Sequence, residues 1–178
     1  MVLAVGKKGS YFGSINSMGR ATMSEYFRGA AWQDRDNLQE NGILMAIAQI
    51  RAVDMCDRNY FDHQDPDGIW PNQYVRQAGY NLPKNYYNDS NQIESIATGH
   101  ADEIEALNAL AASPSHMAHM RGKYFWEDHL FFGVGLYVEN SCKMYVVITA
   151  PTQIEDEHNT DIYIPVISKG VRAHGRAD

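Results

Sequence analysis

The strongest pattern of apolar and polar positions along the chain is a 3.6-residue period between residues 36 and 59. One face of the helix that this period predicts carries Ile43, Ala46, Ile47, Ile50 and Val53, and a second apolar strip beside it carries Leu44, Ala48 and Met55. Two strips indicate a helix that is contacted by more than one layer. The remaining polar face is assigned to Arg51, Asp54, Asp57 and Arg58. Because glycine is unfavourable inside a helix, we expect the helix to run from Gly42 to Asn59.

Three other segments have the features of helices. Ala101–Ala112 has acidic residues in its first turn and an apolar stripe along one side. Pro71–Tyr80 is shorter and begins with proline, which suits the first turn of a helix. Ser113 and Pro114 together predict the start of a third helix. That start places His116 in the first turn and His119 one turn later on a similar face.

The period changes to two in the C-terminal third of the chain. Phe132, Val134, Leu136 and Val138 alternate with Phe131, Gly133, Gly135 and Tyr137. A similar alternation runs through Met144–Thr149, after a turn at Asn140 and Ser141. These segments predict an antiparallel hairpin of Phe131–Val138 and Met144–Thr149 with one strongly apolar face. Gly133 and Gly135 on the other face leave room for a close approach.

The two ends of the chain are less regular. No period is sustained before residue 33, and Ala21–Trp32 forms either a short helix or an irregular arm. Asn81–Gln92 is polar and aromatic, which is typical of a loop or a short edge strand, and Ile162–Val166 has the composition of a further short strand. We therefore expect an N-terminal extension, one domain, and a C-terminal extension or tail at residues 1–33, 34–155 and 156–178.

Composition limits the function classes. The chain has 178 residues, of which 44% are hydrophobic and 21% charged, as in a soluble globular domain. Its formal charge of −7 gives no indication of binding to nucleic acid or to an anionic membrane. No apolar run approaches the roughly 20 residues of a membrane span. Met1–Ser10 has no signal-peptide pattern, so the sequence is either a mature form with an added Met or a protein that is not exported.

The two cysteines allow at most one disulfide. Cys56 lies in a helical pattern and Cys142 beside the turn of the hairpin. Nothing in this arrangement indicates a pair, and two buried free thiols are the favoured expectation. We therefore predict that Cys56 and Cys142 are not bridged.

The stretch Tyr60–Gly68 combines a histidine with strong turn chemistry. Asp65 can bond back to the backbone and Pro66 presets φ, while Gly68 tolerates the exit geometry of the turn. His63 thus has a fixed position, as a site residue requires, although a histidine near a helix C-terminus is also common for structural reasons. Glu94 lies among apolar neighbours and is either exposed on a short turn or held inward by a partner.

The order of four motifs resembles a known family. They are Tyr60-Phe61-Asp62-His63, Glu94-Ser95-Ile96-Ala97, Ser113-Pro114-Ser115-His116 and Phe132-Gly133-Val134-Gly135. In this order they resemble the superfamily of cysteine-rich secretory, antigen-five and pathogenesis-related-one proteins (the CAP or SCP-like domain), particularly its bacterial branch. The resemblance covers about residues 41–152. Ser95 stands where the family usually has asparagine and Ser115 where it has glycine, and His119 and His100 have no family role.

The resemblance implies an α+β fold, an α-β-α sandwich with a small antiparallel sheet flanked by helices. His63 and His116 match the two cavity histidines of the family, and Glu94 matches the glutamate between them. A second glutamate of many members has no equivalent in Leu110-Ala111-Ala112-Ser113. Two neutral imidazoles with room for water can hold Zn²⁺ or another divalent cation. Glu94 would orient an imidazole or act as a base on bound water.

We predict that the imidazoles of His63 and His116 lie within about 6 Å of each other, so that they can share a metal with bonds near 2.1 Å. The structural alternative is a hydrogen-bonded polar cluster that braces three elements. The family resemblance also implies an extracellular or cell-surface location.

Three functions follow as hypotheses. The first is a non-catalytic binding or interaction module for an unknown small ligand, lipid or protein. The second is a metal-dependent, peptidase-like hydrolase that uses His63, Glu94 and His116. The third is sterol or lipid binding, in a pocket lined by the aromatic loop Tyr80–Tyr87.

Overall fold

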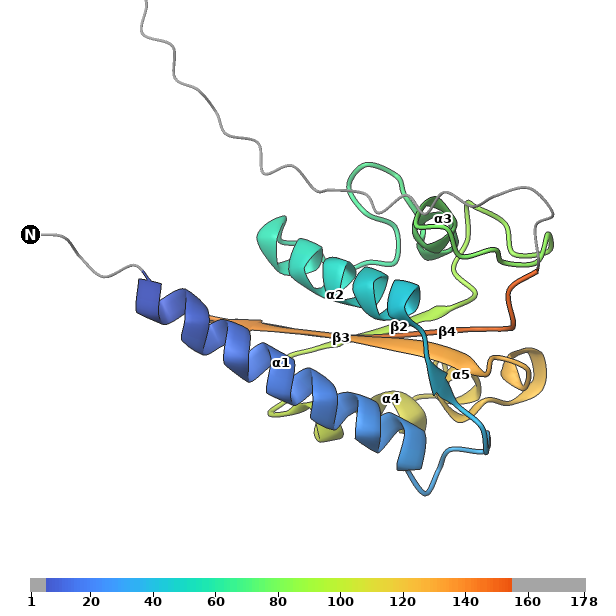
Figure 1. Ribbon diagram of the computed structural model, residues 1–178, viewed down its shortest axis with the longest axis horizontal. Coiled ribbons are helices and arrows are strands. Elements are labelled where there is room, and N and C mark those ends of the chain that lie inside the picture. Colours follow the sequence, from blue (N-terminus) through green and yellow to red (C-terminus); the bar gives the residue numbers. More distant parts are fainter. Residues whose placement is uncertain (1–5, 155–178) are drawn as a thin grey trace, which may run out of the picture.

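A four-stranded sheet lies between two layers of helices in the computed structural model, which describes residues 6–154, with side chains from residue 16 (Figure 1). The strand order is β1-β3-β4-β2. The elements in chain order are α1 (Gly6–Gly29), β1 (Gln39–Glu40), α2 (Gly42–Asp57), α3 (Pro71–Gln77), β2 (Glu94–Thr98), α4 (Glu103–Ala112), α5 (Met117–Arg121), a 3₁₀ turn η1 (Tyr124–Trp126), β3 (Phe131–Glu139) and β4 (Cys142–Ala150). The predicted α+β sandwich is therefore confirmed, with the short β1 added parallel to β3 at one edge.

The hairpin of β3 and β4 is the centre of the sheet, as predicted. The two strands pair antiparallel from Phe131 opposite Ala150 to Glu139 opposite Cys142. The antiparallel β2 pairs with the other edge of β4. Both faces of the hairpin are covered, because α2 and α3 lie on one side and α1, α4 and α5 on the other (Figure 1).

Asn41 caps the N-terminus of helix α2. The side chain of Asn41 accepts hydrogen bonds from the backbone N–H groups of Ile43 and Leu44, which fixes the first turn. Six residues of the helix are buried, namely Leu44, Ile47, Ala48, Arg51, Ala52 and Met55. The assignment of Arg51 to the polar face is wrong, since its side chain is fully buried. An internal partner, described below, makes this burial possible.

The two glycines of β3 explain how closely α2 approaches the sheet. A Cβ atom on Gly133 would lie 2.1 Å from the carbonyl carbon of Leu44, and one on Gly135 would lie 2.0 Å from the carbonyl oxygen of Ala48. Real Cβ contacts are never this short, so only glycine permits the observed packing. The close approach that the sequence predicts on this face is that of a helix backbone.

The second layer includes the N-terminal segment. Helix α1 is much longer than the alternatives considered for Ala21–Trp32, and its residues Met23 and Phe27 are fully buried on the sheet. The ring of Phe27 lies 5.2 Å from that of Phe132 in β3. This helix therefore contributes to the core, and the division of the chain at residue 34 stays a prediction.

The prediction of two free thiols is wrong. Cys56 in the last turn of α2 and Cys142 at the start of β4 form a disulfide, with their Cα atoms 5.9 Å apart. Helical and strand periods indicate which face a residue occupies, but they do not show that the end of α2 lies beside the hairpin turn. The bridge links positions 86 residues apart and fastens α2 to the sheet.

Three local predictions also need correction. Of the two alternatives for Glu94, the exposed turn is wrong and the inward position with a partner is confirmed, because Glu94–Thr98 is a strand paired with β4 and Arg51 holds the carboxylate. Ser113 ends α4 instead of capping a new helix, and His116 is the N-cap of α5 rather than a first-turn residue. Asn81–Gln92 is a loop. The strand predicted at Ile162–Val166 lies outside the described residues, and within these residues no helix is long and apolar enough to cross a membrane.

Candidate functional site

Three separate elements carry the predicted site residues. His63 lies in the loop that follows α2, Glu94 is the first residue of β2, and His116 is the N-cap of α5. The structure joins His63 and Glu94 directly by a contact of 2.9 Å between Nδ1 and Oε1. Among the described residues, no hydrogen bond links His116 to either of them.

Arg51 holds the Glu94 carboxylate inside the protein. Its Nε donates to Oε2 of Glu94 at 2.9 Å and its Nη2 donates to Oε1 at 3.2 Å, and both side chains are fully buried. Burial alone would raise the pKa of Glu94, but the hydrogen bond from His63 and the charge of Arg51 outweigh burial and lower it. Burial likewise lowers the pKa of Arg51, and the Glu94 charge more than reverses this. Glu94 is therefore an ionised carboxylate.

The ionised Glu94 determines the tautomer of His63. A carboxylate without a proton can only accept hydrogen bonds, so Nδ1 of His63 must be the donor. In the neutral imidazole, Nε2 then carries the free lone pair. The His63 side chain is 28% exposed, so this ring remains accessible to a ligand from solvent. Glu94 thus contacts the accessible part of the site only through His63.

The loop that carries His63 is fixed by hydrogen bonds on both sides. Nη2 of Arg51 donates to the carbonyl oxygens of Asp62 and His63 at 2.8 Å. Oδ1 of Asp65 accepts from the backbone N–H groups of Asp67 and Ile69, as the turn chemistry predicts. A fixed backbone limits the positions that the His63 imidazole can adopt.

A second arginine braces the same loop from the end of α2. Arg58 forms ion pairs with Asp54, Asp65 and Asp67. Tyr74 of α3 donates to Oδ2 of Asp65 at 2.5 Å. The loop is therefore anchored to both helices of its layer.

His116 is oriented by hydroxyl groups. Its Nδ1 lies 3.0 Å from the Oγ atoms of both Ser113 and Ser115. Burial lowers the pKa of His116, and the positive charge of His63 lowers it further. The predicted separation of about 6 Å stays a prediction.

His119 belongs to a different, buried group of side chains. Its Nδ1 is 2.7 Å from Oγ of Ser95 and its Nε2 is 2.7 Å from Oγ1 of Thr149. Thr149 Oγ1 is also 2.8 Å from Nδ1 of His129, whose Nε2 is 2.7 Å from the hydroxyl of Tyr86. The expectation that His119 shares a face with His116 is wrong, because the core holds its ring. Ser95, which replaces the usual asparagine of the family, and His119, which has no family role, are hydrogen-bonded to each other.

The two candidate histidines are at most a partial ligand set for a metal ion. Within the part of the chain that the structure describes, no group of three or more His, Cys, Asp and Glu side chains could hold a metal. His63 and His116 therefore provide at most two imidazole ligands, and water or a partner would have to supply the others. Two imidazole nitrogens suit Zn²⁺ and similar transition metals better than Mg²⁺ or Ca²⁺.

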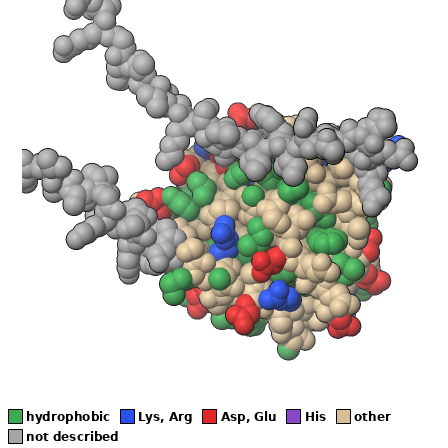
Figure 2. Space-filling model, in the orientation of Figure 1, with side chains coloured by type: hydrophobic (Ala, Val, Ile, Leu, Met, Phe, Trp, Pro, Cys, Tyr) green, Lys and Arg blue, Asp and Glu red, His purple; other side chains and the backbone are tan. Residues whose placement is uncertain are grey.

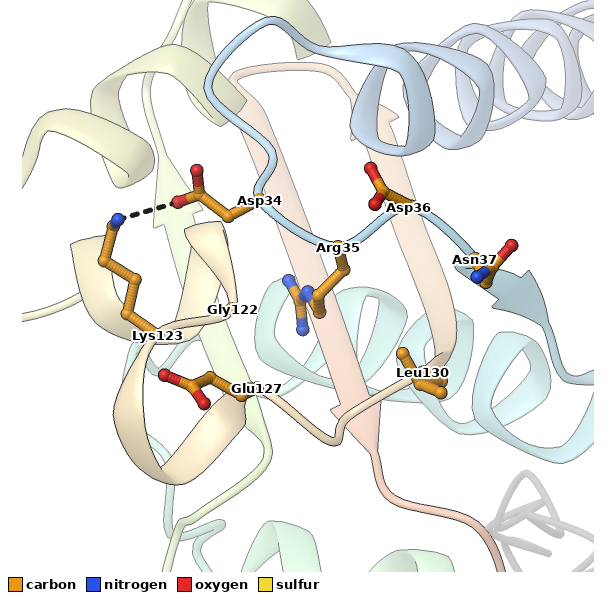
Figure 3. A pocket seen from close by; sticks show the side chains of 8 residues that line it. All are labelled: Asp34, Arg35, Asp36, Asn37, Gly122, Lys123, Glu127 and Leu130. Atoms are coloured by element: carbon orange, nitrogen blue, oxygen red, sulfur yellow. Dashed lines mark ion pairs between the residues drawn. The ribbon is translucent and has the colours of Figure 1, made fainter.

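A polar pocket of about 480 Å³ lies elsewhere, beside the loop between α1 and β1 (Figure 3). Lys123 and Asp34 form an ion pair of 2.9 Å at its edge. The guanidinium of Arg35 lies beneath and donates to the carbonyl oxygens of His119, Met120 and His129. Asp36 and Glu127 add two carboxylates to the lining. The charges of this pocket largely compensate one another.

Comparisons with known proteins agree with this fold. No curated protein sequence matches the chain. An outer surface protein of Borrelia burgdorferi matches in structure with a TM-score of 0.52 and 17% identity, over 85% of this chain and 97% of that one. An extracellular protein of Bacillus anthracis strain Ames that contains an SCP domain matches with a TM-score of 0.50 and 20% identity. That match covers 81% of this chain and 41% of the longer protein.

The sequence itself carries the family signal. The model of the CAP family, the cysteine-rich secretory protein family, matches residues 26–149. This range extends from the last turns of α1 to β4 and includes all three candidate site residues. The chain therefore belongs to the CAP family of cysteine-rich secretory proteins.

Proposed function

We propose that the protein is a non-catalytic binding module in which His63 and His116 hold a divalent metal ion such as Zn²⁺. Nε2 of His63 is the ligand atom, because Nδ1 is committed to Glu94. His116 also has Nδ1 engaged, with the Ser113 and Ser115 hydroxyls, so its Nε2 serves the same purpose. A bound ion would supply open coordination positions to a partner or small ligand.

The position of Glu94 is the observation that carries this proposal. A general base must come within about 3 Å of the water that it deprotonates. The Glu94 side chain is fully buried, and both its oxygens are engaged by Arg51 and His63. It is suited to orienting an imidazole rather than to activating water. This supports binding over the hydrolase hypothesis.

Of the hydroxyl groups near the site, that of Ser95 is not available as a nucleophile. Ser95 is 1% exposed and hydrogen-bonded to His119 on the opposite face of β2 from Glu94. A substrate cannot reach a hydroxyl in that position without opening the core. Ser95 is therefore a structural residue in this proposal.

We further propose that the protein works outside the cytoplasm. The Cys56–Cys142 bridge supports an oxidising compartment, since disulfides rarely persist in the cytosol. One structural relative is described as an outer surface protein and the other as an extracellular protein. Figure 2 shows one face of the protein, on which acidic, basic and apolar side chains are interspersed.

Calorimetric titration with zinc chloride at pH 7.5 tests the metal proposal. We expect weak binding by the unmodified protein and at least a tenfold loss in His63→Ala and in His116→Ala, because one remaining imidazole is a poor site. His100→Ala is the matched control, since its ring lies 4.0 Å from Glu105 and away from Glu94. No binding by the unmodified protein, or equal loss in all three variants, would overturn the proposal. Affinity should also fall on acidification, because only neutral imidazole binds the ion.

A further inference from the structure

A second pocket lies at the aromatic loop after α3. It has a volume of about 380 Å³, within the usual range for small-molecule sites. Its lining residues are Arg76, Lys84, Tyr86, Tyr87, Asn88 and Asp89. Tyr80 and Tyr86 of this loop are buried in the core, whereas the ring of Tyr87 is on the surface with 66% of the residue exposed. The pocket thus combines cationic groups with one accessible aromatic ring.

Arg76 brings an uncompensated positive charge to this pocket. Its Nη1 donates to the carbonyl of Leu82, and its Nη2 donates to those of Pro83 and Tyr86. These acceptors are neutral, and the described residues provide no carboxylate that pairs with the guanidinium. Burial lowers the pKa of Arg76.

The Nε of Arg76 is also without an acceptor. Among the described residues it is the one buried side-chain nitrogen or oxygen that lacks a hydrogen-bond partner. Buried donors are nearly always satisfied, and an exception commonly marks a bound water or ion. A guanidinium whose charge no carboxylate neutralises is well suited to an oxyanion, since charge-assisted hydrogen bonds are the stronger kind.

Lys84 adds a second cation to the same lining. It is exposed and forms no ion pair within the described part of the chain. Asp89 is the one carboxylate of the lining, and it pairs with neither Lys84 nor Arg76 at ion-pair distance. The pocket therefore has an excess of positive charge, although the whole chain has a net charge of −7.

The pocket wall is held in place before any ligand arrives. Asn72 is fully buried and its Nδ2 donates to the carbonyl of Tyr87, to Oγ of Ser90 and to Oε1 of Gln92. These bonds fix the backbone that presents the Tyr87 ring. Such preorganisation reduces the entropy that binding would otherwise cost.

We propose that this pocket binds the phosphate group of a small ligand between Arg76 and Lys84, with an apolar or planar part of the ligand on the ring of Tyr87. The ligand is a phosphomonoester, either free in solution or as the headgroup of a lipid. The site is independent of the His63–His116 site, and its test does not involve metal. In the competing interpretation Arg76 only fastens the loop, and Lys84 and Tyr87 then have no role in binding.

Titration with phenyl phosphate, followed by NMR shifts of the loop amides, tests the proposal. We expect saturable binding that weakens about five- to tenfold in Lys84→Gln. Tyr87→Ala should weaken the binding of phenyl phosphate but leave that of inorganic phosphate nearly unchanged. Lys123→Gln is the matched control, because it removes an equal charge from the pocket in Figure 3 and should have no effect. Arg76 is left intact, because its three carbonyl bonds support the loop.

Vesicles distinguish the two sources of the phosphate. Cosedimentation with phosphatidylcholine vesicles that contain phosphatidic acid, lost in Lys84→Gln, would assign the site to a lipid headgroup. Binding of phenyl phosphate without cosedimentation would assign it to a soluble phosphomonoester. No saturable binding of either probe, or binding that Lys84→Gln and Lys123→Gln weaken equally, would overturn the proposal.

Discussion

At the scale of single residues, Arg51 organises the candidate site. Its guanidinium contacts the Glu94 carboxylate, the Tyr60 hydroxyl and the carbonyls of Asp62 and His63. Charge pairs inside a protein add little net stability, but removal of one partner leaves the other charge buried and uncompensated. The pair of Arg51 and Glu94 therefore fixes the geometry of the site, and its disruption is costly.

Glu94→Gln should lower the free energy of unfolding by about 3 kcal/mol, because it leaves the charge of Arg51 buried without its counter-ion. Urea denaturation at pH 7.5 measures the change. Glu25→Gln is the matched control, since Glu25 is exposed on α1, and it should change stability by less than about 0.5 kcal/mol. A loss below about 1 kcal/mol in Glu94→Gln would mean that Arg51 finds other compensation.

The proximity of His63 and Glu94 could be predicted from the sequence, but the role of Arg51 in holding them could not. The motif order identified both side chains, and the structure joins them at 2.9 Å. Arg51 was assigned to the polar face because charged residues are rarely buried without a partner. Its position four residues after Ile47 and three after Ala48 indicated the buried strip. The partner that makes its burial possible lies 43 residues further along the chain, which no local period reveals.

At the scale of elements, the contact between α2 and β3 sets the spacing of one layer. The backbone of α2 lies directly over Gly133 and Gly135, so two strand positions have no side chain in order to accommodate the helix. The helix thereby brings Arg51 within reach of Glu94 on β2. Helix packing and site geometry are thus coupled through two glycines.

Gly135→Ala should destabilise the protein by roughly 2–3 kcal/mol or more, since its Cβ would lie 2.0 Å from the carbonyl oxygen of Ala48 and force α2 away from the sheet. Gly42→Ala is the control, because a Cβ at the first position of α2 meets no atom within 4 Å. It should be neutral or slightly stabilising. Thermal unfolding of both variants provides the measurement, and similar melting temperatures would contradict the expected overpacking.

Regular periods predicted elements well where the chain has them. The hairpin, α2, α3 and α4 agree with the sequence within a few residues, because each has a clear apolar face. Helix α1 was ambiguous because Gly and Ser are frequent in its first half, and the packing of its Met23 and Phe27 on the sheet is a tertiary contact that no local period reveals. The disulfide was missed for the same reason, as it depends on tertiary proximity.

At the scale of the whole molecule, a continuous chain of buried hydrogen bonds joins the two layers. It runs from Ser95 through His119, Thr149 and His129 to Tyr86, with donor–acceptor distances of 2.7–2.8 Å. Each hydroxyl group and each neutral imidazole in this network has a hydrogen-bond partner for the donor or acceptor that it presents to its neighbour. A protonated imidazole would instead need a second acceptor, and the nearby charge of Arg35 also opposes protonation.

This network should make the protein sensitive to mild acid. Burial lowers the pKa of His129 to about 3 and holds the pKa of His119 well below its ordinary value. Unfolded histidines have a pKa near 6.5, so below that pH the unfolded state takes up protons that the folded state does not. The stabilisation is complete above pH 6.5 and is lost as the pH falls. Each histidine lowers the free energy of unfolding by up to about 1.4 kcal/mol per pH unit.

Urea denaturation between pH 6.5 and 4.5 isolates the effect of the histidines. Glu94 and Asp65 have lowered pKa values, so the stability that their ionised forms contribute is lost mainly below about pH 4. His129→Gln removes one of these imidazoles. On acidification the free energy of unfolding of this variant should therefore fall less steeply than that of the unmodified protein, and the slopes should differ by up to about 1.4 kcal/mol per pH unit. His100→Gln replaces a partly exposed ring outside the network and is the control for the loss of a histidine. The lowered pKa of His116 adds a smaller slope to all three proteins and cancels in the comparison. Equal slopes for His129→Gln and the unmodified protein would show that the core accepts the proton at His129, and that the network opens to water before the fold is lost.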